Sequence, residues 1–316
     1  MGDTSVHRLR LYVGEIARLV ELDTGLPIDM NDVGVELLPA NQALRRITEE
    51  AMIRTGNIGR DYVDPDPIDR LRGRIASLGT EKAVLAAWLP SLDVMLAVME
   101  RVRKMNGSAL GRVIAHELRH TAQDFHYPEF WNYLHAAAKE MLTALVEGGN
   151  DNPRYQEAAD RVNALMALVE GEATHAMNSN INNRFPDPRG STDAESFVGA
   201  ALSLFSKAGA KKTMQYIEGA TLVKALHDAG LEELVEVMFQ HPELAEAALR
   251  KRGRMEIKLD DDVPRDQVEA IRETVVMLRD MNTVGKLFGG GLTVDITSNG
   301  RTLHTLRDGF WLPPEA

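Results

Sequence analysis

Apolar residues recur at intervals of three and four along most of this chain. In residues 6–22 they fall at Leu9, Val13, Ile16 and Val20, which places them on one face of a helix. Similar patterns predict further helices, separated by clusters of glycine, proline and asparagine. These helices are predicted in residues 37–54, 68–78, 109–124, 130–146, 154–178, 194–240, 241–252 and 266–282, with breaks near Gly219 and Gly230. The chain is therefore expected to be mainly α-helical.

Two short apolar runs, in residues 83–88 and 94–99, depart from the helical pattern. Residues 90–93 between them read Pro-Ser-Leu-Asp, which favours a turn, so the pattern predicts a β-hairpin. The alternative is one helix over residues 92–104, because alanine, methionine and glutamate favour helices. If the hairpin forms, one of its strands is expected to offer an open edge to which an extended peptide can add.

A second group of strands is predicted near the C-terminus. Residues 257–262 are strand-like, and residues 292–296 alternate between apolar and polar. Asn299 and Gly300 form a strong hairpin turn before a returning strand in residues 302–306. Together with the helices, these strands predict a mainly α fold with a small β-sheet or hairpin.

A chain of 316 residues can hold one large domain or two modest ones. The changes in pattern predict an N-terminal helical region in residues 1–78 and a C-terminal region of a helix and a β-hairpin in residues 253–316. Residues 79–252 lie between them and contain the candidate chemistry described below.

Composition and charge narrow the classes of function. The chain is 44% hydrophobic and 26% charged, as in soluble globular proteins, and it has no apolar run of about 20 residues that could span a bilayer. Its net charge of −11 argues against nucleic acid as a partner, because binding phosphates requires clustered lysine and arginine. The first residues lack the apolar core of a signal peptide, so the expected location is either the cytoplasm or an exported compartment after removal of a signal. The oligomeric state stays open.

The strongest metal-binding pattern is the H-E-x-x-H pentad of residues 116–120. On a helix, His116 and His120 lie one turn apart on the same face, so both imidazoles can point at one metal ion. Glu117 lies beside them, where its carboxylate can face water bound at the metal. The chain has no cysteine, so any metal must be held by histidine, aspartate, glutamate or water.

A catalytic zinc usually takes three protein ligands, so a third ligand is needed. The candidate region is residues 168–175, which read LVEGEATH within a long predicted helix. A carboxylate flanked by Leu168, Val169 and Ala173 is expensive to bury without a cationic partner, and a metal ion is such a partner. Gly171 fits a place where this helix approaches another backbone closely.

These segments together resemble the gluzincin clan of zinc metallopeptidases, in which a helix with H-E-x-x-H is followed by a helix with E-G-x-A. Residues 116–127 read HELRHTAQDFHY and residues 167–173 read ALVEGEA. They are similar to HELxHAxQDxHF and LVEGxA segments of uncharacterised bacterial metallopeptidase-like proteins. Tyr216 and Gly219 match a Tyr-x-x-Gly helix of that group, and the resemblance covers residues 83–250.

The resemblance implies a zincin-like α+β metallopeptidase fold, with Glu170 as the third ligand of a Zn²⁺ ion held by His116 and His120. The implied function is a zinc-dependent metallopeptidase that hydrolyses a peptide or protein substrate, with Glu117 as the general base. Two alternatives stay open. One is a protein in which zinc only joins two helices, and the other is a non-catalytic protein of zincin-like fold that binds a peptide.

His126 is the alternative third ligand, because it follows His116 by ten residues, as in the metzincin motif. That motif needs a sharp turn at its eighth position, where glycine supplies a positive φ, but this chain has Gln123 there. If the helix continues, His126 lies about 9 Å along the axis from the second histidine of the motif. Glu172 is a weaker alternative, because it points to another helix face than Glu170 and is expected to be solvated.

Two residues are candidates for stabilising a developing oxyanion. Tyr216 could donate its phenol, and the alternative is a core tyrosine with a satisfied hydroxyl. His175 could act in the same way or fill a polar pocket. Asp124 is a candidate for orienting a ligand histidine by accepting its ring N–H, and the alternative is a cap at the end of the helix.

Overall fold

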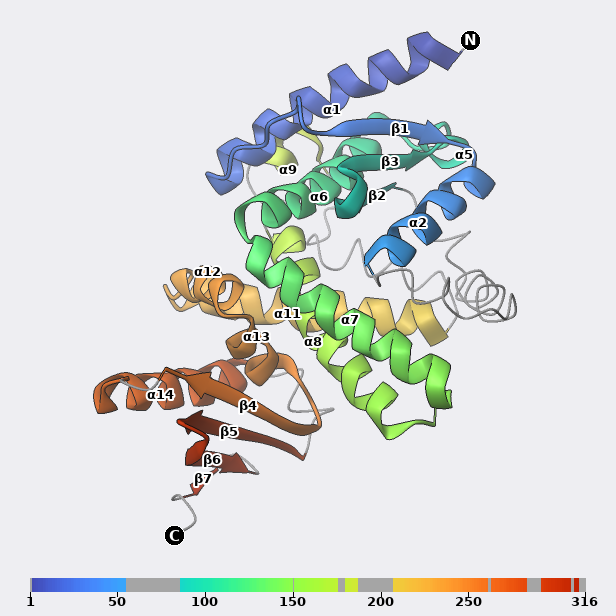
Figure 1. Cartoon of the computed structure of the whole chain (residues 1–316). Helices are drawn as coiled ribbons and strands as arrows, with labels where there is room; N and C mark the ends of the chain where they lie inside the picture. Colours follow the sequence, from blue (N-terminus) through green and yellow to red (C-terminus); the bar gives the residue numbers. More distant parts are fainter. Residues whose placement is uncertain are drawn as a thin grey trace. The chain divides into compact units, whose positions relative to one another are not determined.

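A computed structural model of the chain describes residues 2–54, 86–149, 151–175, 180–186, 207–260, 263–282, 291–307 and 310–312. Its described residues are mainly helical with two small sheets, which confirms the prediction of a mainly α fold with a small β-sheet (Figure 1). The helices are α1 (Gly2–Thr24), α2 (Ala40–Arg54), η1 (Pro90–Leu92), α5 (Met99–Val102), α6 (Gly107–His126), α7 (Pro128–Gly148), α8 (Pro153–His175), α9 (Asn180–Arg184), α11 (Lys207–Asp228), α12 (Glu233–Gln240), α13 (Pro242–Leu249) and α14 (Arg265–Met281). The strands are β1 (Gly34–Leu38), β2 (Ala86–Leu89), β3 (Val94–Val98), β4 (Gly253–Leu259), β5 (Leu292–Ser298), β6 (Arg301–Arg307) and β7 (Phe310–Leu312).

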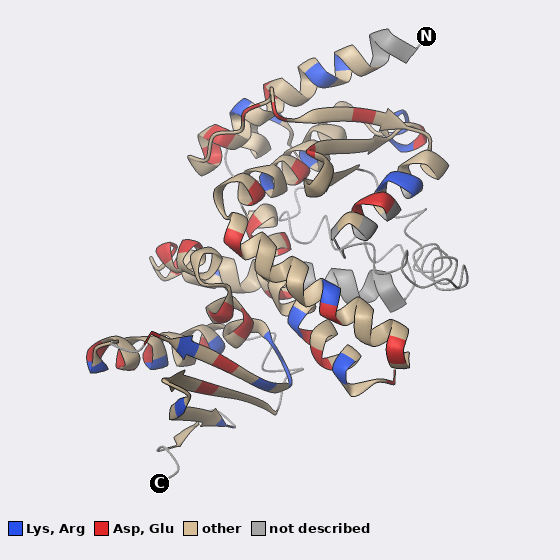
Figure 2. Ribbon diagram, viewed as in Figure 1, with Lys and Arg blue, Asp and Glu red and all other residues tan. Residues whose placement is uncertain are grey.

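The chain groups into two compact units. The first comprises Met1–Trp131 and Ala173–Tyr216, and the second comprises Asn132–Glu172 and Ile217–Ala316. Acidic and basic residues are interspersed on the same elements, as α14 illustrates (Figure 2). Within the described ranges, no helix has the length and apolar character needed to cross a membrane.

In the first unit, β1, β3 and β2 form a three-stranded sheet with β3 in the centre. β3 runs parallel to β1 and antiparallel to β2, and η1 with Asp93 makes the turn between β2 and β3. Asp93 adopts the left-handed conformation with φ of 49°, which aspartate tolerates better than most residues. The predicted hairpin is therefore confirmed, and the alternative of one helix from residue 92 is wrong, because a helix begins only at Met99.

Both faces of this sheet are covered, which explains why every residue of β3 is buried. On one face, Met95 and Ala97 belong to a core formed with α1 and α6. On the other face, Leu96 and Val98 pack in a smaller cluster with Ala43 of α2. The helix predicted in residues 37–54 is wrong at its start, because backbone pairing with β3 draws its first residues into β1. The helix predicted in residues 68–78 lies outside the described residues.

In the second unit, the strands form a four-stranded sheet in the order β4-β5-β6-β7. β4 runs parallel to β5, and the other neighbours are antiparallel. Asn299 and Gly300 have φ values of 54° and 68°, as a two-residue hairpin turn requires, and this confirms the predicted hairpin between β5 and β6.

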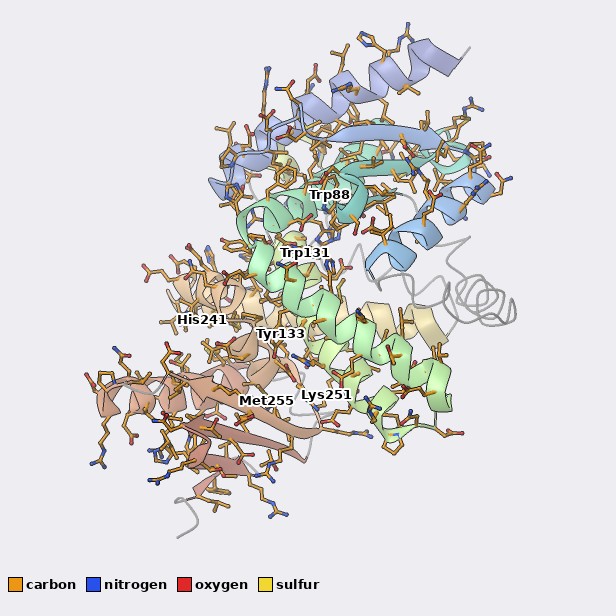
Figure 3. The ribbon with its side chains drawn as sticks, viewed as in Figure 1. Trp88, Trp131, Tyr133, His241, Lys251 and Met255 are labelled. Carbon is orange, nitrogen blue, oxygen red and sulfur yellow. The ribbon has the colours of Figure 1, made fainter. Side chains whose placement is uncertain are left out.

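A buried carboxylate joins three helices of the second unit. Glu246 of α13 is 2% exposed and accepts hydrogen bonds from the Tyr133 hydroxyl of α7 (2.7 Å) and from Nε of Arg161 in α8 (3.0 Å). Its other oxygen accepts from Nη1 of Arg250 at 2.5 Å. Burial, and then the charge of Glu246, raises the pKa of the Tyr133 phenol, a side chain labelled in Figure 3. This network fixes α8, the helix that carries Glu170, against its neighbours.

Two glycines let α8 and α11 approach each other closely. A Cβ atom at Gly219 would lie 1.7 Å from the carbonyl oxygen of Ala167, and one at Gly171 would lie 2.1 Å from the carbonyl carbon of Gly219. The close approach predicted for Gly171 is therefore confirmed. The predicted break near Gly219 is wrong, because α11 continues through this residue. Glycine at position 219 serves packing rather than helix termination.

We expect the substitution Gly219→Ala to lower the free energy of unfolding by about 3 kcal/mol, at the upper end of overpacking costs. The added methyl group overlaps backbone, which cannot rotate away as a side chain can. Gly14→Ala is the matched control, because nothing lies within 4 Å of a Cβ atom built at Gly14 in α1. The control should stabilise the protein by ~0.5–1 kcal/mol through helix propensity. Urea unfolding followed by circular dichroism measures both, and equal stability of the two variants would contradict the close packing.

Candidate metal centre

The helix α6 presents the pentad as the sequence predicts. The side chain of Asn106 caps its N-terminus by accepting from the backbone N–H of Ala109 at 2.8 Å. The helix continues to His126 without interruption, so residues four apart share a face. His116 and His120 are 1% and 7% exposed, and their rings meet edge to face with centroids 4.6 Å apart.

His116, His120 and Glu170 form a buried group that is close enough to hold a metal ion. One ligand atom from each residue lies within 4.8 Å of the other two. The Nε2 atoms of the two histidines are 3.1 Å apart. In a tetrahedral zinc site with Zn–N distances of about 2.0–2.1 Å, two nitrogen ligands lie about 3.3 Å apart. The donor set and the spacing of the two nitrogens therefore fit a metal ion.

The carboxylate of Glu170 lies in the apolar environment that its neighbours predict. Glu170 is 3% exposed, and Leu168, Val169 and Ala173 on the same helix are fully buried. A carboxylate in such surroundings requires compensation, and a divalent cation is one group that can supply it. Glu172 is also buried, at 7% exposure, so the expectation of a solvated acid is wrong for this residue. The face of α8 that carries Glu172 is covered, which the helical pattern alone did not indicate.

Gln123 is a site residue that the sequence interpretation missed. It is completely buried, and its Oε1 lies 2.9 Å from Nδ1 of His120. Because an amide oxygen accepts hydrogen bonds, this contact favours the tautomer with the proton on Nδ1, which leaves the lone pair of Nε2 for a metal. The signal was available, because Gln123 follows His120 by three residues and shares its helix face.

The structure separates His126 from the metal-binding group and gives Asp124 a partner outside it. His126 is exposed, and its Nε2 lies 3.0 Å from the carbonyl oxygen of Pro27. Among the described residues, it is not part of the metal-binding group. Asp124 was a candidate for orienting a ligand histidine, but its Oδ2 accepts the indole N–H of Trp88 at 3.0 Å. Gln123 contacts His120 in the way that was expected of Asp124.

Trp88 connects β2 to α6 at two points. Its backbone N–H donates to Oε2 of Glu117 at 3.0 Å, while its indole N–H bonds to Asp124. Trp88 is the partner of Met95 in the antiparallel pair of β2 and β3. Its N–H bonds to Glu117 and not to β3, so the backbone groups of Trp88 point away from the sheet. In the described sheet, β2 has β3 as its only neighbour. Glu117 therefore lies on the side of β2 that faces away from β3.

We expect Trp88→Phe to lower the free energy of unfolding by about 2 kcal/mol, the value of a hydrogen bond to a charged group. Phenylalanine can keep a ring near Phe125, whose centroid lies 5.8 Å from that of Trp88, but it lacks the indole N–H and the volume of the second ring, so both losses contribute. Asp124→Asn is the control, because its carbonyl oxygen still accepts the bond. Denaturant unfolding should give the highest free energy of unfolding for the wild type, a lower one for Asp124→Asn and the lowest for Trp88→Phe. The reverse order would contradict a stabilising bond between Trp88 and Asp124.

The two candidates for oxyanion stabilisation stay predictions. His175 is the last residue of α8 and is half-buried. Tyr216 lies in α11, and its side chain is outside the described residues.

No family model matches the chain, and neither the curated proteins nor the solved structures contain a detectable relative. The buried group of His116, His120 and Glu170 thus supports the metal-binding part of the prediction. The gluzincin resemblance rests on the sequence motifs.

Proposed function

We propose that this protein is a zinc-dependent peptidase of gluzincin type. The observation that carries the proposal is the buried group of His116, His120 and Glu170, together with Glu117 on the same helix as the two histidines. Two imidazoles and one carboxylate are the ligand set of many catalytic zinc sites, which keep a further position open for water or substrate. Imidazole nitrogen is a better ligand for zinc than for magnesium or calcium, because these two ions prefer oxygen ligands.

A zinc ion held by His116, His120 and Glu170 would supply Lewis acidity, which polarises a carbonyl group and lowers the pKa of bound water. Glu117 is the general base in this proposal, because its carboxylate can take a proton from water and pass it to the leaving amine. The bond from the Trp88 backbone to Oε2 holds the carboxylate in one orientation. Oε1 is the oxygen that we assign to proton transfer. His120 stays in the tautomer suited to a metal through Gln123.

A peptide is the proposed substrate because Glu117 lies at a strand edge. An extended chain could add to this edge of β2 through main-chain hydrogen bonds to Ala86 and to the Trp88 carbonyl oxygen, because the Trp88 N–H already donates to Glu117. Such bonds bind peptides with little dependence on sequence. The backbone groups of Ala86 face the same edge as those of Trp88, since residues two apart point the same way. Main-chain pairing at this edge would bring a peptide bond beside the Glu117 carboxylate.

The proposal is tested by metal analysis and a cleavage assay on the same preparation. The purified chain is expected to contain about one zinc per molecule and to cleave members of a quenched fluorescent peptide library. Treatment with a chelator should abolish cleavage, and added zinc should restore it. A preparation that binds zinc tightly without cleaving any peptide would support the non-catalytic alternative. A preparation that binds no divalent metal would overturn the proposal altogether.

A further inference from the structure

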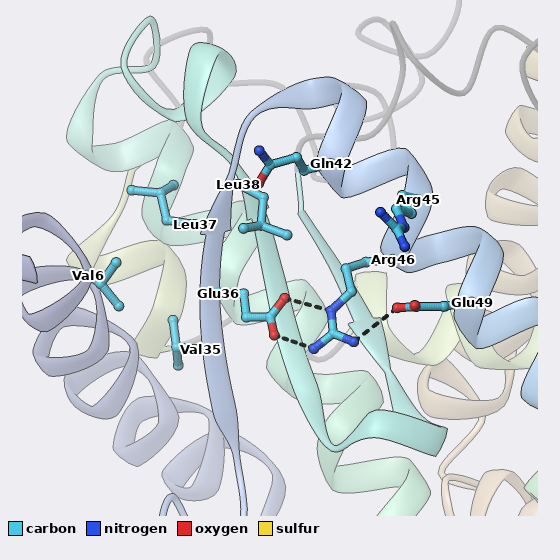
Figure 4. A pocket seen from close by; sticks show the side chains of 9 residues that line it. All are labelled: Val6, Val35, Glu36, Leu37, Leu38, Gln42, Arg45, Arg46 and Glu49. Carbon is cyan, nitrogen blue, oxygen red and sulfur yellow. Dashed lines mark hydrogen bonds and ion pairs between the residues drawn. The ribbon is translucent and has the colours of Figure 1, made fainter. Parts of the chain in front are cut away.

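A groove of about 630 Å³ in the first unit lies along β1 and has no part in the proposed metal chemistry (Figure 4). Side chains from both faces of β1 line it. Val35 and Leu37 project to one side of the strand, and Glu36 and Leu38 project to the other. Side chains of opposite faces can line one groove only where the edge of the strand forms its floor. The groove is therefore built around the free edge of β1.

The backbone register shows which groups this edge offers. β1 is parallel to β3, and the N–H of Gly34 donates to the carbonyl oxygen of Asp93 at 2.7 Å. In a parallel pair, every second residue of a strand bonds to the same neighbour, so Gly34 shares the β3 side with Glu36. Val35 and Leu37 then present their N–H and C=O groups to the groove. In the described sheet β1 has no second neighbour, so these groups can pair with an added strand.

The two walls of the groove differ in chemistry. The wall on the α1 side is apolar and contains Val6 together with Val35 and Leu37. A strand added to β1 would place every second side chain against this wall, and the others against α2. The apolar wall therefore selects apolar residues at alternate positions of the added strand.

The wall on the α2 side contains two arginines with different surroundings. Arg46 is engaged, because its Nε and Nη2 donate to both oxygens of Glu36 at 3.0 and 2.5 Å and its Nη1 donates to Glu49 at 3.0 Å. These hydrogen bonds, that to Glu36 first, raise the pKa of Arg46. Arg45 is exposed and forms no ion pair with the described residues. A carboxylate on an added strand would be the complementary group for Arg45.

We propose that the free edge of β1 binds a peptide in extended conformation whose side chains alternate between apolar and acidic residues. Main-chain hydrogen bonds to Val35 and Leu37 supply the register, the α1 wall takes the apolar side chains, and Arg45 binds an acidic one. This site is distinct from the proposed substrate edge, because β1 and β2 lie on opposite sides of β3. Its peptide is bound and not cleaved, and binding does not require a metal ion.

The test uses the full chain, treated with a chelator, and a capped hexapeptide that alternates valine and glutamate. Isothermal titration calorimetry measures its dissociation constant. Two matched peptides separate the contributions: one has lysine in place of glutamate, and one carries N-methyl groups on every second amide. We expect either change to weaken binding about tenfold or more, because one reverses the charge and the other removes main-chain donors. Use of the metal-free chain keeps this result independent of the proposed peptidase activity.

Two protein variants complete the test. Arg45→Glu should weaken binding of the glutamate peptide about tenfold and strengthen binding of the lysine peptide. Leu37→Pro removes a donor that faces the groove, and proline is tolerated at a strand edge where its nitrogen needs no ladder bond. Arg18→Glu is the charge control, because Arg18 lies about 18 Å along α1 from Val6. The affinity of Arg18→Glu for the glutamate peptide should match that of the wild type.

Three outcomes would overturn the proposal. The first is no binding of the hexapeptide at millimolar concentration. The second is binding that Arg45→Glu, Leu37→Pro and N-methylation all leave unchanged. The third is a wild-type dimer that Leu37→Pro converts to a monomer, because a second copy of the chain would then occupy the edge. Light scattering on both proteins detects this last case.

Discussion

Replacing Glu170 by glutamine is expected to weaken zinc binding by more than about 100-fold. Mutations of residues that only support metal ligands typically cost about 10–100-fold in affinity, and the loss of a direct ligand should cost more. Glutamine keeps the size of the side chain but removes the negative charge that compensates the metal. Competition with a chromogenic zinc chelator measures the affinity of each variant.

The matched control for this prediction is Glu172→Gln. Glu172 lies two residues further along α8 and is also buried, at 7% exposure, so it undergoes the same chemical change in a similar environment. Among the described residues it is not part of the metal-binding group. Its zinc affinity should stay within a few-fold of the wild type. Equal losses in the two variants would show that charge on α8, rather than ligation by Glu170, controls zinc binding.

The sequence predicted well those elements whose signals are local. The hairpin of β2 and β3 followed from turn residues between two apolar runs, and the hairpin of β5 and β6 followed from Asn299 and Gly300. The predicted start of α6 lies close to the observed one, because the Asn106 cap marks it. In each case the information lies within a few residues of the structure that it specifies.

The errors arose where the deciding contact is distant in sequence. Residues Gly34–Leu38 become a strand because they pair with β3, about sixty residues later in the chain. The pattern of apolar residues within this segment does not indicate that pairing. Gly219 has the composition of a helix break, but it is glycine because the backbone of Ala167 lies against it. A glycine within a helical pattern thus has two explanations, and only the neighbouring helix distinguishes them.

The candidate metal site divides in the same way. His116 and His120 were predictable from helix geometry, and the resemblance added Glu170. The hairpin was expected, but the bond from the Trp88 backbone to Glu117 requires the packing of β2 on α6. Gln123 was considered only as an obstacle to a turn, although its spacing from His120 allowed a supporting role.

The most discriminating prediction concerns Glu117→Gln. We expect this variant to bind zinc as tightly as the wild type and to lose peptide hydrolysis by about 10²–10⁴-fold, the contribution of a positioned general base. The amide is nearly isosteric, and its carbonyl oxygen can still accept the Trp88 backbone N–H that now bonds to Oε2 at 3.0 Å. The contact between residue 117 and β2 should therefore persist, while the glutamine side chain cannot take a proton from water.

Asp124→Asn is the control for Glu117→Gln, because it makes the same chemical change on the same helix and also concerns a partner of Trp88. Its hydrolysis should remain within a few-fold of the wild type. Zinc content, circular dichroism and the rate of cleavage of one library peptide are measured for both variants. Loss of zinc from Glu117→Gln would assign Glu117 to the metal site itself. Retained hydrolysis would exclude it as the base, and water would then have to be activated by another residue.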